Sequence, residues 1–568
     1  MDSLLKNNSF RYGALFFILL TGLFIRVYHS ETYVYGPDQI MHIQMSDAKS
    51  VAEVWQFSKN ETHPPLGYII RYFWLKISHS SIWMHMLGYS CDVITILLFY
   101  LIGNKLEPGS GLFAALLGAL CPIMVNMAQV IRNYSIFLMF ITACLYCYLQ
   151  FMEKKDGKWL LFYMIAAALA AATHFSAAIP LAAMGTITFY TLFREKNWRL
   201  LIIWSGANGM VALLLLFFYL QISWALFVYA LAKTSFMANL RNTILELFFL
   251  PIYYPPIFLP NFIDQMPAFL REHPLSNTLI NDGTRILFVV FIYSAIAELH
   301  KAHKLFFQLT ILSLVTLLIL CFFQYYDLLL RHNVWLAPFI ILPTSILLYQ
   351  LWDKTITIFT SALKIKLYPV IIAWLTVSTV LIPFDQNSYR KHDEALAGSE
   401  TNRWLEYIAD HVKSGDVIVS GRAPIITLYY YMLGRNYYRD LPALNDKSYY
   451  TDHQLDIRSI LMRATDEAGR SYISPAYEYT LATPDDVDIL FKDIIAKGWL
   501  KDAHNVWFLK VIDADEREAQ RLAGCPKLQG EIKYRFVYPA EQLIFFAIPK
   551  ADLLEVLKSD GKYRSCLQ

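Results

Sequence analysis

Charged residues are scarce in this chain, and several common enzyme motifs are missing from it. Of 568 residues only 17% are Asp, Glu, Lys or Arg, whereas 56% are hydrophobic, a balance that excludes an ordinary soluble enzyme. The sequence has no glycine-rich phosphate loop, which argues against a pump driven by ATP. It has no basic tract, and its net charge is only +3, so we expect no nucleic-acid partner.

Long apolar runs fill the chain up to about Asp385 and then stop. Beyond that position charged residues become frequent, and helix patterns alternate with strand patterns, as in a soluble α/β domain. We therefore predict an α-helical polytopic membrane domain over residues 1–384 and a soluble domain over 385–568. The apolar segments predict eleven membrane spans, at 12–28, 82–103, 111–129, 132–152, 158–174, 176–193, 200–223, 286–299, 305–323, 334–352 and 367–384.

The short connections between these spans indicate the orientation of the chain in the cell (inner) membrane. Lys or Arg occurs in the N-terminal lead and in every connection of one set, and such loops usually face the cytoplasm. The set comprises 103–110, 153–158, 194–199, 300–304 and 353–366. We therefore expect a cytoplasmic N-terminus, with the loop 29–81 and the C-terminal domain on the periplasmic or extracytoplasmic side. No small-x-small cleavage site follows the first span, so we expect that span to be retained.

The loop 29–81 carries an unusual set of side chains for a segment so close to the bilayer surface. Asp38, His42, His63 and Arg71 lie in it beside aromatic residues. An acid, imidazoles and a guanidinium at the mouth of a helical bundle suggest acid–base chemistry on an anionic substrate. The alternative is a solvated loop in which Asp38 only caps a helix.

Three short polar turns fall on the same predicted outer side. They are Gln-Val-Ile-Arg-Asn-Tyr at 129–134, Thr-His-Phe-Ser at 173–176 and Arg-His-Asn at 331–333. Ionisable residues near a membrane usually face a cavity and serve function. A single arginine could instead snorkel to lipid phosphates, but several polar turns on one face favour a site.

These motifs resemble a known group of enzymes, the GT-C glycosyltransferases. In that group an acidic residue follows the first span, His-Pro-Pro begins a juxtamembrane helix, and a short Gln-x-x-Arg-x-Tyr turn recurs. The similarity is greatest to the branch of protein O-mannosyltransferases, lipid A aminoarabinose transferases and their bacterial relatives. The matching residues are Asp38, His63-Pro64-Pro65, Gln129, Arg132-Asn-Tyr134 and, less specifically, Arg331. The resemblance implies a GT-C-like membrane fold and a hexosyl- or pentosyltransferase that uses a polyprenyl-phosphate-linked sugar. The acceptor would be a glycan, lipid or protein at the outer face of the membrane.

Two departures from the family pattern bear on metal binding. The family often has a second acidic residue where this chain has Gln39, and a carboxylate where it has Val130. Hard cations need clustered oxygen ligands, so we expect neither a metal site nor a cofactor. The same departures leave Asp38 as the main candidate base.

Roles for the other residues follow from the chemistry that the resemblance implies. The acceptor hydroxyl needs a base, and the departing phosphate needs cations. With Asp38 as the base, direct displacement predicts inversion at the anomeric carbon. The candidate phosphate ligands are Arg132, Arg331, His332 and Arg71. The candidate substrate-binding residues are His42, His63, Gln129 and Tyr134. His63 and its two prolines could instead only fix the start of a helix.

A lipid or oligosaccharide transporter or flippase is the alternative function. It would predict charges at the bilayer midplane and broken helices in paired halves. The sequence shows no such repeat.

The soluble domain carries no catalytic constellation, so we expect it to bind the acceptor, cover the membrane site or only add stability. Its two cysteines, Cys525 and Cys566, should form a disulfide if it faces an oxidising compartment.

Overall fold

The computed structural model divides the chain into two compact units. Unit 1 comprises residues 1–31 and 49–389, and unit 2 comprises residues 32–48 and 390–568. The structure describes residues 8–27, 35, 37–59, 63–221, 295–297, 299–300, 303–322, 330–358, 405–420, 422–440, 461–468, 470–475, 494–501, 503–513, 532–537 and 541–549. The short segment 32–48, which belongs to the predicted first outer loop, is thus grouped with the C-terminal part of the chain.

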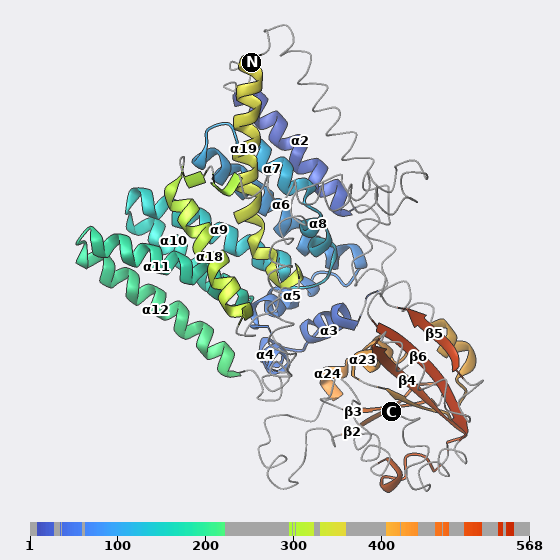
Figure 1. The fold of residues 1–568 in the computed structure, drawn as a ribbon. Helices are drawn as coiled ribbons and strands as arrows, with labels where there is room; N and C mark the ends of the chain where they lie inside the picture. Colours follow the sequence, from blue (N-terminus) through green and yellow to red (C-terminus); the bar gives the residue numbers. More distant parts are fainter. Residues whose placement is uncertain are drawn as a thin grey trace. The chain divides into compact units, whose positions relative to one another are not determined.

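Unit 1 is helical (Figure 1). Its described helices are α2 (Asn8–Val27), α4 (Val51–Ser58), α5 (Leu66–Leu75), α6 (Ser81–Leu106), α7 (Gly111–Leu120), α8 (Pro122–Gln129), α9 (Tyr134–Lys154), α10 (Gly157–Ala171), η2 (Phe175–Ala177), α11 (Ala178–Arg194), α12 (Trp198–Gln221), α18 (Lys304–Phe322), η4 (Leu330–Leu336) and α19 (Ala337–Ile358). Among the described residues, six helices are long and apolar enough to cross a membrane, and a seventh span results if α7 and α8 count as one bent helix.

This architecture confirms the transmembrane character that the sequence predicts. The number of eleven spans stays a prediction, because the segment 367–384 and most of 286–299 lie outside the described residues. The helices pack through a continuous apolar core in which small residues allow close approach. Ala167, Ala170 and Ala171 of α10 are buried and belong to the same core cluster as Tyr148 of α9, and these two helices are neighbours in the bundle.

The predicted span 111–129 is broken rather than continuous. α7 and α8 are inclined by 55° to each other. The break falls at Cys121, whose backbone is extended, with φ of −62° and ψ of 115°. The residue before a proline is disfavoured in helical geometry, and Pro122 then occupies the first turn of α8, where proline is tolerated. After the break, α8 continues to Gln129, directly before the polar turn.

The described residues of unit 2 include a six-stranded mixed sheet with the order β2-β3-β1-β4-β6-β5. Its described elements are α3 (Pro37–Ser46), β1 (Val417–Ser420), α23 (Arg422–Tyr431), α24 (Tyr437–Asp440), β2 (Leu461–Thr465), β3 (Ser471–Pro475), β4 (Asn505–Asp513), β5 (Ile532–Val537) and β6 (Glu541–Pro549). β1 pairs in parallel with β3 and β4 and is buried along its whole length, as expected of a central parallel strand. The buried Asp416 carboxylate accepts hydrogen bonds from the backbone N of Asn505 at 3.0 Å and from Trp507 Nε1 at 2.9 Å, tying β1 to β4.

Candidate functional site

The turn between α8 and α9 presents Arg132. The chain is extended at Val130, and the Arg132 N–H donates to the Val130 carbonyl at 2.8 Å. Arg132 is only 6% exposed. Its Nη2 donates to the Tyr134 hydroxyl at 3.3 Å, and its guanidinium carbon lies 5.4 Å from the centre of the Tyr134 ring. The turn therefore holds a guanidinium against an aromatic ring at the start of α9.

A second arginine, Arg71 of α5, lies against the same turn. It is 2% exposed, and its Nη2 donates to the Arg132 carbonyl at 3.0 Å while its Nη1 donates to Asn133 Oδ1 at 3.3 Å. Within the part of the chain that the structure describes, its Nε has no hydrogen-bond partner. Burial lowers the pKa of Arg71 to about 10, Tyr68 opposes this effect, and the Arg132 charge adds to it. Arg71 remains a cation at neutral pH, and no carboxylate pairs with it among the described residues.

The start of α5 is fitted closely to its neighbours. The Leu66 N–H donates to the Ala172 carbonyl at the end of α10 at 3.0 Å. A Cβ on Gly67 would lie 2.3 Å from Asn133 Cγ, so any other residue at this position would force the Asn133 side chain to move. His63, Pro64 and Pro65 lead into this helix, which agrees with the preference of proline for helix starts.

Aromatic and imidazole rings gather beside the two arginines. The His63 ring centre lies 4.7 Å from that of His174 and 6.2 Å from that of Tyr134, and His174 lies 4.9 Å from Phe137. His174 Nδ1 accepts a hydrogen bond from the Ser176 N–H at 3.1 Å, which puts the proton of the neutral ring on Nε2. The sequence indicated a polar outer turn at 173–176 but gave His174 no role, because nothing local shows which rings it meets.

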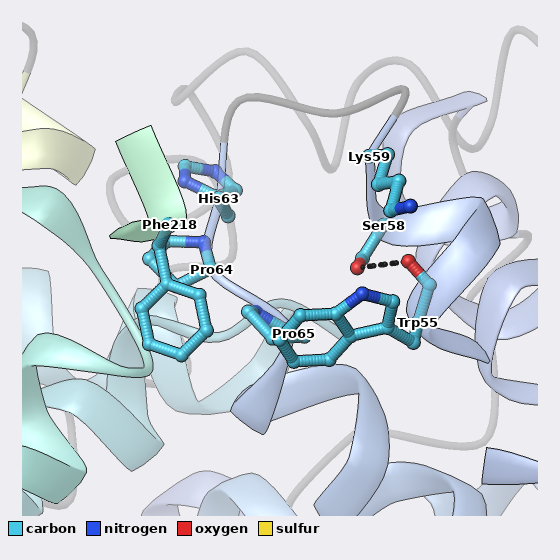
Figure 2. A pocket seen from close by; sticks show the side chains of 7 residues that line it. All are labelled: Trp55, Ser58, Lys59, His63, Pro64, Pro65 and Phe218. Carbon is cyan, nitrogen blue, oxygen red and sulfur yellow. Dashed lines mark hydrogen bonds between the residues drawn. The ribbon is translucent and has the colours of Figure 1, made fainter. Parts of the chain in front are cut away.

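A pocket opens next to His63. It is small and open to the surroundings, and it is lined by Trp55, Ser58, Lys59, His63, Pro64, Pro65 and Phe218. Trp55 and Phe218 flank the two prolines (Figure 2) and have ring centres 5.8 Å apart. The lining combines apolar rings with one ammonium group and one imidazole. Such a lining suits a ligand that has both apolar and anionic parts.

The remaining candidates fall into three places. η4 carries Arg331 and His332 and packs beside α8, α9 and η2, so the backbone brings them to the same end of the bundle as the turn 129–134. Gln129, at the end of α8, donates from Nε2 to the Arg26 carbonyl at 3.2 Å. Cys525 and Cys566 lie outside the described residues.

Asp38 and His42 belong to unit 2. They lie one helical turn apart on α3, on one face of that helix. His42 is 1% exposed, and Asp38 is half-buried in the first turn, where the helix dipole favours a carboxylate. The structure therefore brings together two groups of predicted residues, one within each unit.

The sequence did not assign roles to Arg26 and Asp92, which are both fully buried. Arg26 Nε donates to Asp92 Oδ2. Its Nη1 donates to the carbonyls of Gly22 and Ala119, each at 2.9 Å, and its Nη2 donates to the Gly118 carbonyl at 3.2 Å. Two of these carbonyls end α7, where helical partners run out. A lone base and a lone acid in two predicted spans were the signal that could have indicated this pair.

No group of three or more His, Cys, Asp or Glu side chains that could hold a metal ion occurs among the described residues. The candidate base is a single carboxylate, and the residue after it is Gln39. This donor set does not fit the clustered oxygen ligands of a hard cation. We therefore derive no step through a metal.

Comparison with known proteins gives one match to a protein family. Residues 62–224 match the family of dolichyl-phosphate-mannose-protein mannosyltransferases. This confirms the resemblance to GT-C glycosyltransferases. The matching segment contains His63, Arg71, the turn 129–134 and His174, but not Asp38 or η4. No curated protein matches the chain.

Two solved structures are similar to the chain at low identity. ArnT from Cupriavidus metallidurans bound to undecaprenyl phosphate is 11% identical, with a TM-score of 0.42, covering 95% of this chain and 98% of that one. The oligosaccharyltransferase AglB from Archaeoglobus fulgidus, in complex with an inhibitory peptide and a dolichol-phosphate, is 11% identical, with a TM-score of 0.43, covering 90% of this chain and 70% of that one.

Proposed function

We propose that this protein is a membrane glycosyltransferase that moves a sugar from a polyprenyl-phosphate donor to an acceptor hydroxyl at the outer face of the membrane. The observation that carries the proposal is the adjacent pair of buried arginines, Arg71 and Arg132. Both lie in the segment that matches the mannosyltransferase family. Arg71 is buried, and no carboxylate pairs with it among the described residues. Such a cation is costly, and binding an anion would offset that cost.

The charge of the donor changes during the proposed reaction in a way that two cations favour. The sugar-linked phosphodiester carries one negative charge, and the departing polyprenyl phosphate carries up to two. Cations that meet the charge as it develops stabilise the transition state more than the bound substrate. Arg132 would hold the phosphate oxygens with its planar fork, while Arg71 behind the turn would add positive potential. Arg331 and His332 on η4 would contact the same group.

Asp38 would act as the base that takes the proton of the acceptor hydroxyl. The acceptor oxygen then forms a bond to the anomeric carbon while the bond to the phosphate oxygen breaks, with inversion at that carbon. His42 lies one turn from Asp38 on α3 and would orient the acceptor. His63, Gln129 and Tyr134 would bind the donor.

The pocket beside His63 supports a donor with a lipid part. Trp55 and Phe218 supply apolar rings, and Lys59 supplies a cation. Trp55 belongs to the short helix α4, and Phe218 belongs to α12, a helix that is long and apolar enough to cross the membrane. A lipid phosphate carries its charge at the end of an apolar chain, so this combination of groups fits it.

One observation favours the transporter alternative, namely the break between α7 and α8, since transporters use broken helices to bind substrates. At this break, however, the Gly118 and Ala119 carbonyls accept hydrogen bonds from Arg26. The freed backbone groups are thus used within the protein, which supports a fixed bend in a catalytic bundle.

Mass spectrometry of surface glycans and membrane lipids, with and without this protein, tests the proposal. Cells without it should lack one sugar on a surface glycan, lipid or protein and accumulate the polyprenyl-phosphate sugar. Cells that carry the Asp38→Asn variant should show the same two changes, because the fold and donor binding remain while the rate falls at least about a hundredfold. Unchanged glycan and lipid masses in cells without the protein would refute the transferase. Normal products in Asp38→Asn cells would refute the base assignment alone.

A further inference from the structure

The C-terminal end of α3, the helix that carries Asp38, is hydrogen-bonded to the loop that follows α23 in the C-terminal part of the protein. Gly434, with φ of 59°, follows α23 and lets the chain turn sharply. Gln44 Nε2 then donates to the Arg435 carbonyl at 3.1 Å, and the Tyr437 N–H donates to Gln44 Oε1 at 3.2 Å. The side-chain amide of Gln44 is therefore paired at both atoms with the backbone of this loop.

Asn436 adds two bonds from the same loop. Its Nδ2 donates to the Gln44 carbonyl at 2.6 Å and to the Asp47 carbonyl at 3.1 Å. These carbonyls belong to the end of α3, where the backbone has no helical partners left. Asn436 Oδ1 accepts from the Tyr438 N–H at 3.0 Å, which fixes the orientation of the amide. Asn436 thus caps α3 from a position 392 residues away in the sequence.

The N-terminal end of the segment is bound to α23. The Tyr35 N–H donates to the Tyr431 hydroxyl at 2.9 Å, and the Tyr35 and Tyr430 rings meet edge to face at 6.3 Å. Tyr35 precedes Asp38 by three residues. A helix of ten residues is marginal by itself in water, so these contacts at both ends determine where α3, and with it Asp38, is held within unit 2.

We propose that Tyr431 and Asn436 are positioning residues for Asp38. This inference rests on the proposed function, in which Asp38 is the base. The proposed role of the two side chains is exerted through α3 and not through contact with the substrates. They hold the ends of a helix about 15 Å long, so that the carboxylate meets the acceptor hydroxyl in the reactive geometry. A displacement of about 1 Å at a reacting group can lower a rate roughly a hundredfold, which gives the C-terminal unit a direct part in catalysis.

The test uses the full-length protein in lipid nanodiscs. The donor comes from membrane lipids that are extracted from cells without this protein. Released polyprenyl phosphate is measured by mass spectrometry. Tyr431→Phe removes one acceptor atom and keeps the ring. Tyr472→Phe is the matched control, because its hydroxyl donates to Asp466 at 2.7 Å in the same unit. We expect Tyr431→Phe and Asn436→Ala to lower kcat roughly tenfold or more with KM for the donor unchanged, and Tyr472→Phe to leave both constants unchanged.

A double variant separates positioning from a general structural role. If Asn436 acts through Asp38, then Asn436→Ala should slow the wild-type enzyme but should not slow Asp38→Asn further. Equal slowing in both backgrounds would overturn the inference. A slow Asp38→Asn enzyme combined with normal rates in Tyr431→Phe and Asn436→Ala would also overturn it and leave the proposed function intact. A normal rate in Asp38→Asn would instead remove Asp38 as the base, and the inference with it.

Discussion

Replacing Arg71 by Met separates an anion-binding role from a structural one, because two effects on the free energy oppose each other. Methionine keeps an unbranched apolar stem but removes the charge. Without ligand, the variant loses the hydrogen bonds to the Arg132 carbonyl and Asn133 Oδ1, worth about 1.5–3 kcal/mol each for a charged donor. It also relieves a buried cation whose pKa falls from 12.5 to about 10, which corresponds to roughly 3 kcal/mol. The variant should therefore lose between zero and about 3 kcal/mol of unfolding free energy.

The effect on ligand binding should be much larger. A phosphate charge about 6 Å from the guanidinium, at an effective dielectric constant of about 20, gains about 3 kcal/mol. Losing that term weakens binding roughly a hundredfold. Thermal unfolding of the protein in nanodiscs, with and without undecaprenyl phosphate, measures both quantities. Undecaprenyl phosphate should raise the Tm of the wild type, and Arg71→Met should keep most of the ligand-free Tm while losing most of this rise.

Two other arginines serve as controls for an exposed charge and for a buried structural charge. Arg199 is exposed, so Arg199→Met should change neither Tm nor ligand response. Arg26→Met leaves the Asp92 carboxylate buried without its partner, which should cost about 3–5 kcal/mol of stability. If Arg71→Met lowers the ligand-free Tm as much as Arg26→Met and keeps the full ligand response, Arg71 is a support of the turn and the reasoning is wrong.

Three further predictions concern the same lipid phosphate and the C-terminal domain. Arg132→Ala and Arg331→Ala should each weaken undecaprenyl phosphate binding several-fold or more, with only partial recovery in the Lys variants, which lose the fork; unchanged affinity in both Ala variants would favour snorkelling. Because Arg71 is charged below its pKa of about 10 and neutral above it, affinity should fall as pH rises through about 10, and a flat titration across that range would contradict its role. Non-reducing mass spectrometry of tryptic peptides should show Cys525 linked to Cys566, a bond that would stabilise the domain by roughly 3–4 kcal/mol; two free thiols in protein from the native compartment would count against it.

The membrane helices could be predicted because their signal is local. The predicted spans 82–103 and 132–152 differ from α6 (Ser81–Leu106) and α9 (Tyr134–Lys154) by a few residues at each end. An apolar run longer than the hydrocarbon core identifies a span whatever surrounds it. Basic and aromatic residues at the ends of such runs likewise indicated the turn 129–134 as a candidate site.

The break in the third span could not be predicted with the same rule. Pro122 separates α7 from α8, whereas Pro343 lies inside the continuous helix α19. Membrane helices tolerate proline when neighbours satisfy the freed backbone groups. At Pro122 the neighbour that satisfies the freed carbonyls is Arg26, which is paired with Asp92, and here the helix is bent. That arrangement depends on three helices at once, and no single stretch of sequence shows it.

The placement of Asp38 also depends on distant contacts. The segment 32–48 is predicted to belong to an outer loop because it lies between two predicted spans, yet the structure groups it with residues 390–568. Hydrogen bonds from Gln44 to Arg435 and Tyr437, more than 390 residues away, hold the segment there. Composition and periodicity carry no information about such pairs, so the role of the loop after α23 could only come from the structure.

The most direct test of the central claim is whether the purified protein breaks a bond in the donor. Vesicles that contain the protein are loaded with lipids and surface glycans from cells that lack it, and mass spectrometry follows the polyprenyl-phosphate sugar and the acceptor over time. The glycosyltransferase account predicts free polyprenyl phosphate and an acceptor heavier by one sugar in equal amounts, with both products nearly absent for Asp38→Asn. Intact donor that only moves between the two leaflets would contradict the account and identify a transporter.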